Sequence, residues 1–158
     1  MKRVNSSAPY KIDLTDNFRS SVSQLKKAHY KKDTASGAAF EAVLDGYFLK
    51  FEKAPHAVPS SRAEPWPAKC HDERFKFYKS DFHMPGLSGA SGQGRIMWLV
   101  CDGTTTVHVV WVYTHAQYGG RPSDKGLRVE LNSAMEGAIK ALRERAESQS
   151  NAAERPKG

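Results

Sequence analysis

Cysteine is scarce in this sequence, and no hydrophobic run approaches the length needed to cross a membrane. The two cysteines, Cys70 and Cys101, are far apart, so they indicate neither a disulfide framework nor a zinc knuckle, and we expect two ordinary reduced thiols. The first three residues are Met-Lys-Arg, and they lead into the polar residues 5–7 instead of the apolar stretch of a signal peptide. These features predict a cytoplasmic protein with no membrane partner.

Motifs for binding metals and nucleotides are missing as well. Most of the six histidines are scattered over expected helices and loops without the short, fixed spacing of metal ligands: His29, His56, His71 and His83. The segment Gly92-Gln93-Gly94 lacks the Lys-Ser/Thr pair that completes a phosphate-binding loop, and it precedes a strand rather than a helix. We therefore expect no metal site and no small-molecule cofactor.

Acidic residues are outnumbered by basic ones. With 17 Asp and Glu against 24 Lys and Arg, the formal net charge of the 158-residue chain is +7 at pH 7. This excess favours a polyanionic partner, with nucleic acid first and an acidic protein second. A chain of this length can bury most of a single core. We expect one domain over residues 9–146, between a flexible N-terminus (1–8) and a flexible C-terminal tail (147–158).

The N-terminal half is expected to contain one short strand and two helices. Residues 10–14 alternate apolar and polar side chains, as a half-buried strand does. Thr15 or Asp16 can cap a first helix, and the segment 33–36 offers a cap for a second helix, whose broad apolar stripe is typical of a core-facing helix. Several prolines then end the helical pattern, so residues 54–71 predict a loop.

The C-terminal half is expected to contain three strands and a helix. Apolar and basic residues alternate over 74–78, which predicts a strand, and the glycine- and serine-rich segment 81–94 predicts a long loop without regular structure. An Asp-Gly turn between the runs 94–100 and 107–113 is a strong signal for a β-hairpin. A helix with an apolar stripe can start at residues 122–124.

These elements predict an α+β fold, in which an N-terminal strand and a helical hairpin pack on a small, twisted, mainly antiparallel sheet with a C-terminal helix. The second hairpin strand is apolar on both faces, so we expect it to lie inside the sheet. Strict alternation divides its side chains into two sets: Val107, Val109, Trp111 and Tyr113 on one face, and His108, Val110 and Val112 on the other. We expect His108 to fill a buried, hydrogen-bonded position.

The first hairpin strand points Arg95 away from the face that the N-terminal helices cover. The other face is left for the C-terminal helix and for a basic groove containing Arg95, Arg74 and Lys76, which would suit a phosphate backbone. Strict alternation places His115 on the face opposite Arg95. The two can therefore share a site only if the chain bends after Tyr113.

The order of strand, helical hairpin, basic strand, Gly-x-Arg hairpin and terminal helix resembles the RelE/ParE toxin superfamily, in particular its RelE and HigB ribonuclease branches. The resemblance covers residues 9–145, and its specific part is 74–121. Five residues match the family's functional positions: the basic pair Arg74 and Lys76, the Gly-x-Arg arginine Arg95, the strand-end residue His115 and the tyrosine Tyr118.

This resemblance implies a RelE-like toxin of a type II toxin-antitoxin system, which cleaves mRNA on the ribosome without a metal by attack of a ribose 2′-OH on the adjacent phosphate. It implies that Arg95 holds the scissile phosphate and that His115 and Tyr118 transfer protons. The implied RNA-binding residues are Arg74, Lys76, Lys79 and Arg121. The implied partners are a cognate antitoxin protein, mRNA and the ribosome.

Two other functions fit the same residues. One is a non-catalytic, ParE-like poison of DNA gyrase, and the other is a basic RNA- or ribosome-binding module with the same fold and no activity. At the level of single residues, Arg95 could be a surface or salt-bridging arginine, and Arg74 and Lys76 could form the solvated face of an edge strand.

Overall fold

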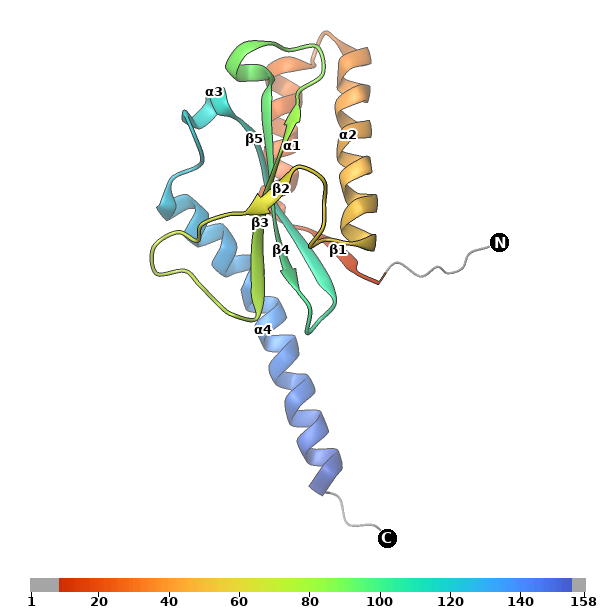
Figure 1. The fold of residues 1–158 in the computed structure, drawn as a ribbon, viewed down its shortest axis with the longest axis vertical. Helices are drawn as coiled ribbons and strands as arrows, with labels where there is room; N and C mark the ends of the chain where they lie inside the picture. The colour runs from red at the N-terminus through yellow and green to blue at the C-terminus, as the bar shows by residue number, and fades with distance from the viewer. Residues whose placement is uncertain (1–8, 155–158) are drawn as a thin grey trace, which may run out of the picture.

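The protein is a single five-stranded sheet with helices on both faces, as seen in a computed structural model that describes residues 9–154 (Figure 1). The strands in chain order are β1 (Lys11–Leu14), β2 (Ser61–Ala63), β3 (Phe75–His83), β4 (Gln93–Cys101) and β5 (Thr106–Thr114). The helices are α1 (Asp16–His29), α2 (Thr34–Lys53), α3 (His115–Tyr118) and α4 (Asp124–Glu154). The expected flexible N-terminus, residues 1–8, lies outside the described residues.

The strand order β1-β5-β4-β3-β2 makes the sheet mixed but mainly antiparallel. Strand β1 pairs with β5 in parallel, whereas the β5–β4, β4–β3 and β3–β2 pairs are antiparallel. The expected α+β fold class, with a helical hairpin and a C-terminal helix on a small sheet, is therefore confirmed. So are the interior position of β5 and the pairing of the basic strand β3 with the hairpin.

Polar side chains cap the three long helices where the sequence predicts them. The Thr15 side chain accepts a hydrogen bond from the Phe18 backbone N–H at the start of α1, and Asp33 accepts one from Ser36 at the start of α2. Ser123 Oγ accepts a hydrogen bond from the Gly126 backbone N–H and starts α4 in the same way. These local bonds fix where each helix enters the sheet.

One face of the sheet is covered by α1 and α2. Trp98 is fully buried there, with its ring centroid 4.6 Å from that of Phe51, and its indole N–H donates to the Pro55 carbonyl at 3.2 Å. The buried apolar side chains of this layer come from both helices and from β4 and β5: Phe18, Leu25, Phe40, Leu44, Phe51, Ile96, Trp98, Val100, Val107, Val109 and Val112. This is the larger of the two hydrophobic layers.

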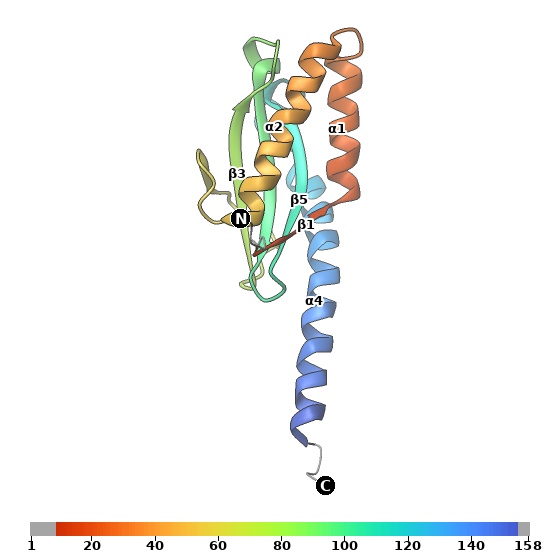
Figure 2. The ribbon, with the colours of Figure 1, turned by 90° about the vertical axis from the view of Figure 1, so that its right-hand side faces the viewer.

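The opposite face is covered by the first half of α4. Its apolar stripe packs on β3, β4 and β5 through Leu127, Leu131, Met135 and Ala138. Figure 2 shows that the second half of the helix extends past the end of the sheet, and residues 143–151 are exposed. Helix α4 continues to Glu154, eight residues into the segment expected to be a flexible tail (147–158).

Two segments expected to be loops contain strands. Strand β3 runs to His83 and β4 begins at Gln93, so the expected loop over 81–94 shrinks to the connection between them, which includes a 3₁₀ turn at Gly89–Gly92. Within the expected loop over 54–71, residues 61–63 form the edge strand β2 on β3. Both strand segments owe their conformation to pairing with β3 or β4.

A β-bulge in β5 overturns the expected division of its side chains. Met97 pairs with Trp111 but Trp98 pairs with Val109, so Val110 is the extra, unpaired residue. Beyond the bulge the alternation is reversed, which puts Trp111 and Tyr113 on the α4 face, the same face as His108. Val112 correspondingly joins Val107 and Val109 on the opposite face.

Candidate functional site

Arg95 lies near the start of β4 on the α4 face of the sheet, at the end where α3 stands. Its cross-strand neighbours are Tyr113 on β5 and Asp81 on β3. Figure 1 shows α3 toward the upper end of the sheet, and α4 beginning lower and running away from α3 along the sheet. Arg95 therefore lies at the α3 end of the sheet, opposite Tyr113 and one residue from the pair Gly94–Thr114 that precedes α3.

The guanidinium of Arg95 is held on two sides. Its Nε lies 3.0 Å from Oδ1 of Asp81, and its Nη1 donates to the Gly94 carbonyl at 3.0 Å. The side chain is 18 % exposed, and within residues 9–154 its Nη2 has no hydrogen-bond partner. A guanidinium fixed in this way presents its remaining donors in a defined direction.

The glycine of the Gly-x-Arg motif has a packing role. Gly94 pairs with Phe82 across the β3–β4 ladder, and a Cβ at Gly94 would lie 2.6 Å from two ring atoms of Phe82. Any larger residue would push the ring away or displace β4. The motif thus fixes the strand that carries Arg95.

Tyr113 is a site residue that the sequence analysis missed. It is fully buried, and its hydroxyl has no hydrogen-bond partner among the described residues. Burial raises the pKa of Tyr113, and the negative charge of Glu64 adds to this effect, whereas Arg95 opposes it. Its ring meets that of Tyr118 edge to face at a centroid distance of 5.6 Å, so Tyr118 joins the cluster that contains Arg95.

Lys79 and Arg121 form a second group around the buried carboxylate of Glu64. Lys79 Nζ lies 3.2 Å from one carboxylate oxygen, and Arg121 Nη1 lies 3.0 Å from the other. Arg121 also bonds the Pro65 carbonyl at 2.7 Å and Asp124 at 3.0 Å, which ties the β2–β3 connection to the start of α4. Both cations lie near the candidate site, but the carboxylates of Glu64 and Asp124 offset their two charges.

Arg74 and Lys76 do not lie in a groove with Arg95, contrary to the sequence-based expectation. Lys76 pairs with Val100 five residues along β3 from Asp81, so it lies on the opposite face of the sheet and near its other end. Arg74 precedes β3 and binds the carboxylate of Asp72 through Nε at 2.9 Å and Nη2 at 2.7 Å. On β3, the basic side chain that shares a face of the sheet with Arg95 is that of Lys79.

His115 follows the end of β5 directly. The chain turns into α3 after Thr114. Thr114 pairs with Gly94, the residue before Arg95, so His115 follows the strand pair that adjoins Arg95. Gln117 accepts a hydrogen bond from the Thr114 backbone N–H at 2.9 Å, and Gly119 ends the short helix in the left-handed conformation, with φ of 63°. In the described part of the chain no hydrogen bond or ion pair joins His115 to Arg95.

The sequence contained only part of the signal for this site. The Gly-x-Arg pattern identified Arg95, but Asp81 lay within the segment expected to be a loop and Glu64 within another. Tyr113 was assigned to the wrong face because a single-residue bulge at Val110 is invisible in the hydrophobic pattern.

Nowhere in residues 9–154 do three or more His, Cys, Asp or Glu side chains converge on a position for a metal ion. None of the helices of that part of the chain combines the length and the apolar composition of a membrane span.

Comparison with known proteins gives a distant likeness. No protein-family model and no curated protein matches the sequence. A solved structure similar to this chain is the crystal structure of an archaeal RelE-RelB complex from Pyrococcus horikoshii OT3, with a TM-score of 0.41 and 13% identity over 69% of this chain and 98% of that chain. A likeness of this size carries no conclusion about activity.

Proposed function

We propose that this chain is a RelE-like endoribonuclease toxin that holds an RNA phosphate with Arg95 at the α3 end of the sheet. The observation that supports this most directly is the state of the Arg95 side chain, whose Nε and Nη1 are fixed by Asp81 and Gly94 while Nη2 has no partner in residues 9–154. Such a fixed guanidinium is suited to a phosphate oxygen. The Gly-x-Arg hairpin followed by His115 and Tyr118 is the second support.

The proposed reaction is a transesterification within RNA. The ribose 2′-oxygen forms a bond to the adjacent phosphorus, the bond to the 5′-oxygen breaks, and the products are a cyclic phosphate and a free 5′-hydroxyl. A base takes the proton of the 2′-OH, an acid supplies one to the 5′-oxygen, and Arg95 stabilises the charge on the phosphorane. His115 and Tyr118, at the two ends of α3, are the candidates for base and acid.

The proposal includes mRNA on the ribosome as substrate, a cytoplasmic location and a protein antitoxin as the neutralising partner. The net charge of +7 supports a polyanionic substrate. The proposal of an antitoxin partner rests on the resemblance of the sequence to toxins of this superfamily.

The proposal is tested by replacing Arg95 with alanine. We expect Arg95→Ala to lower the rate of mRNA cleavage by about 100-fold or more, because one positioned donor to the transition-state charge is lost. Cleavage is measured by mapping the 5′ ends of mRNA in cells and with translating ribosomes, and growth arrest on expression is recorded alongside.

Arg74→Ala is the matched control, since Arg74 is an exposed arginine paired with Asp72 and far from Arg95. We expect this variant to cleave like the wild type. A folded Arg95→Ala protein with wild-type cleavage would exclude the proposed site.

A second candidate is an RNA- or ribosome-binding module that does not cleave. One observation favours it: in the described residues no hydrogen bond or ion pair joins His115 to Arg95. Salt-sensitive RNA binding that leaves the RNA intact, even with translating ribosomes, would support this function. Accumulation of gyrase cleavage complexes in the presence of the purified protein would instead support a gyrase poison.

A further inference from the structure

Arg62 lies beside the candidate site on β2, the edge strand within a segment expected to be a loop. It pairs with Lys79 across the β2–β3 ladder, and Lys79 is two residues from Asp81, the partner of Arg95 on β4. The side chains of Arg62 and Arg95 therefore lie on the same face of the sheet. That of Arg62 is 48 % exposed, so solvent and ligands can reach it. The inference that follows rests on the proposed ribonuclease function.

One carboxylate oxygen is shared by the two arginines. Oδ1 of Asp81 lies 3.0 Å from Nε of Arg95, and it accepts a hydrogen bond from Nη2 of Arg62 at 3.1 Å. A carboxylate carries one negative charge, so the two guanidinium groups together keep a net positive charge beside it. In residues 9–154, Nε and Nη1 of Arg62 have no hydrogen-bond partner. Arg62 is thus oriented by Asp81 and has donors left for an anion.

The charge next to Arg62 on the sheet also favours an anion. Arg62 lies directly opposite Lys79, and like charges in this position repel each other. Lys79 is 14 % exposed and already paired with Glu64, whereas Arg62 is the more exposed of the two. An anion that binds beside Arg62 would lower this repulsion.

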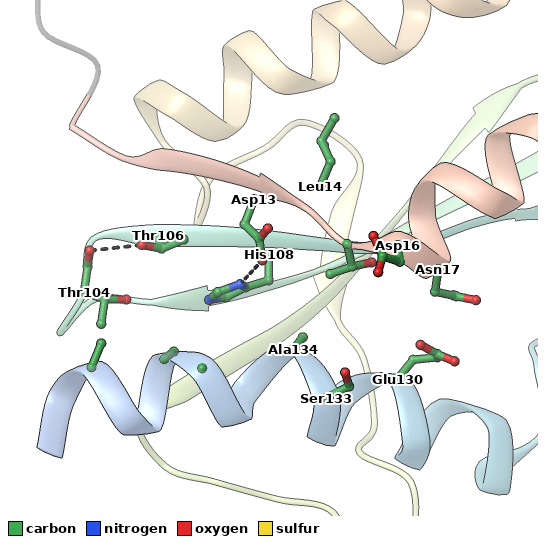
Figure 3. Close-up of a pocket in the computed structure, with 14 residues that line it drawn as sticks. Asp13, Leu14, Asp16, Asn17, Thr104, Thr106, His108, Glu130, Ser133 and Ala134 are labelled. Carbon is green, nitrogen blue, oxygen red and sulfur yellow. Dashed lines mark hydrogen bonds and ion pairs between the residues drawn. The ribbon is translucent and has the colours of Figure 1, made fainter. Parts of the chain in front are cut away.

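The other edge of the same face is acidic. Asp13 and Asp16, at β1 and the start of α1, border one depression together with Glu130 of α4 (Figure 3). These carboxylates repel a phosphate backbone. An RNA strand that crosses the sheet at Arg95 is therefore attracted toward β2 and not toward β1.

The strand order decides which part of an RNA Arg62 meets. In the order β5-β4-β3-β2, His115 and Tyr118 follow β5 on one side of Arg95, and Arg62 lies on the other side. The proposed proton transfers take place between Arg95 and α3. Arg62 therefore faces the adjoining part of the RNA and not the reacting atoms.

We propose that Arg62 binds the RNA phosphate next to the scissile one, on the side of Arg95 away from α3. The substrate is then an RNA that continues from Arg95 across β3 to the β2 edge, with a phosphate on that side of the cleavage position. Asp81 acts as a positioning residue for both arginines, because its Oδ1 contacts both guanidinium groups.

The test compares Arg62→Ala with Arg74→Ala in binding to a short, labelled single-stranded RNA. The two arginines are matched in exposure, 48 % and 51 %, and each is paired with an aspartate, but only Arg62 shares its aspartate with Arg95. We expect Arg62→Ala to bind the RNA about tenfold more weakly, and the slope of log Kd against log salt concentration to fall by about 0.7, as for the loss of one phosphate contact. Arg74→Ala should bind like the wild type.

Arg62→Ala should keep the wild-type rate of mRNA cleavage when translating ribosomes are in excess, because Arg62 does not touch the reacting atoms. Arg95→Ala should not keep this rate. A cleavage rate lowered as much in Arg62→Ala as in Arg95→Ala would place Arg62 on the scissile phosphate and overturn the proposal.

Removal of Arg62 also leaves Asp81 to Arg95 alone, so an indirect effect through Arg95 is tested with the double variant. In the Arg95→Ala background, Arg62→Ala should still weaken RNA binding about tenfold and lower the slope by a further 0.7 or about that value. Equal binding by Arg95→Ala and the double variant would mean that Arg62 acts only through Asp81, which contradicts the proposal.

Two further outcomes separate this inference from the proposed function. A wild-type protein that neither binds nor cleaves RNA would overturn both. Cleavage that depends on Arg95, together with equal RNA binding by the wild type and Arg62→Ala, would overturn the role of Arg62 alone.

Discussion

Arg95 differs from the other basic residues on this sheet in what its charge already binds. Arg74 donates two hydrogen bonds to the carboxylate of Asp72, and Arg121 donates to Glu64 and to the Pro65 carbonyl. An exposed pair such as Arg74–Asp72 is screened by solvent and adds little to stability, so its loss should be tolerated. Arg95 shares its carboxylate, because Oδ1 of Asp81 also lies 3.1 Å from Nη2 of Arg62, and its side chain is 18 % exposed against 51 % for Arg74. Arg95 is therefore the more firmly held and the less completely neutralised of the two, which makes it the candidate for RNA recognition.

The buried hydroxyl of Tyr113 leads to a prediction at the same scale. Because it has no partner in the described residues, replacing it should remove an unfavourable buried polar group. We expect Tyr113→Phe to raise the free energy of unfolding by about 1 kcal/mol, as measured by urea denaturation.

The matched variant is Tyr47→Phe. Tyr47 is also buried, but its hydroxyl is 2.8 Å from Ser80 Oγ and donates to the Asp81 carbonyl at 3.3 Å. Its loss should lower the free energy of unfolding by about 1 kcal/mol. Destabilisation of similar size in both variants would mean that the Tyr113 hydroxyl is satisfied in solution.

Among the secondary structure elements, those with local causes could be predicted from the sequence. Thr15 and Asp33 cap the helices that follow them, and the Asp-Gly turn joins β4 to β5. Each of these signals lies within a few residues of the structure it specifies. The helical hairpin, the β-hairpin and the start of α4 were predicted correctly for this reason.

Elements with non-local causes could not be predicted. The three residues of β2 are a strand because β3 offers them a free edge, and the bulge at Val110 exists because β4 and β5 must satisfy cores on both faces. That bulge decides which side chains accompany Arg95. The candidate site was therefore predictable at Arg95 and Tyr118, and not at Tyr113, Asp81 or Glu64.

The exposed second half of α4 gives a prediction for this element. Residues 143–151 are exposed. Arg145 still contacts the β4–β5 turn, where its Nη1 donates a hydrogen bond to the Gly103 carbonyl at 2.6 Å. Truncation after Arg145 should remove helix without removing core, so the melting temperature should change by no more than about 2 °C. Circular dichroism should show the loss of helix at the same time. A much larger drop in melting temperature would mean that the projecting helix packs against another surface in solution.

Across the whole molecule, charge is separated along one face of the sheet. The α3 end carries Arg95 with Lys79 and Arg121 around Glu64, whereas the β1 edge carries the carboxylates of Asp13 and Asp16 near Glu130 of α4. The basic and the acidic side chains of this face therefore lie toward different ends of it.

The pairing of the cations near Arg95 predicts a shallow salt dependence for RNA binding. The net charge is +7, but most cations near Arg95 are paired, so we expect about three phosphate contacts. For single-stranded RNA this gives a slope near 2 for log Kd against log salt concentration, at about 0.7 per contact. The slope is measured by fluorescence anisotropy of a labelled RNA. Arg95→Ala should lower it by about 0.7, and Arg74→Ala should leave it unchanged. A slope that Arg95→Ala does not alter would place the RNA elsewhere on the protein.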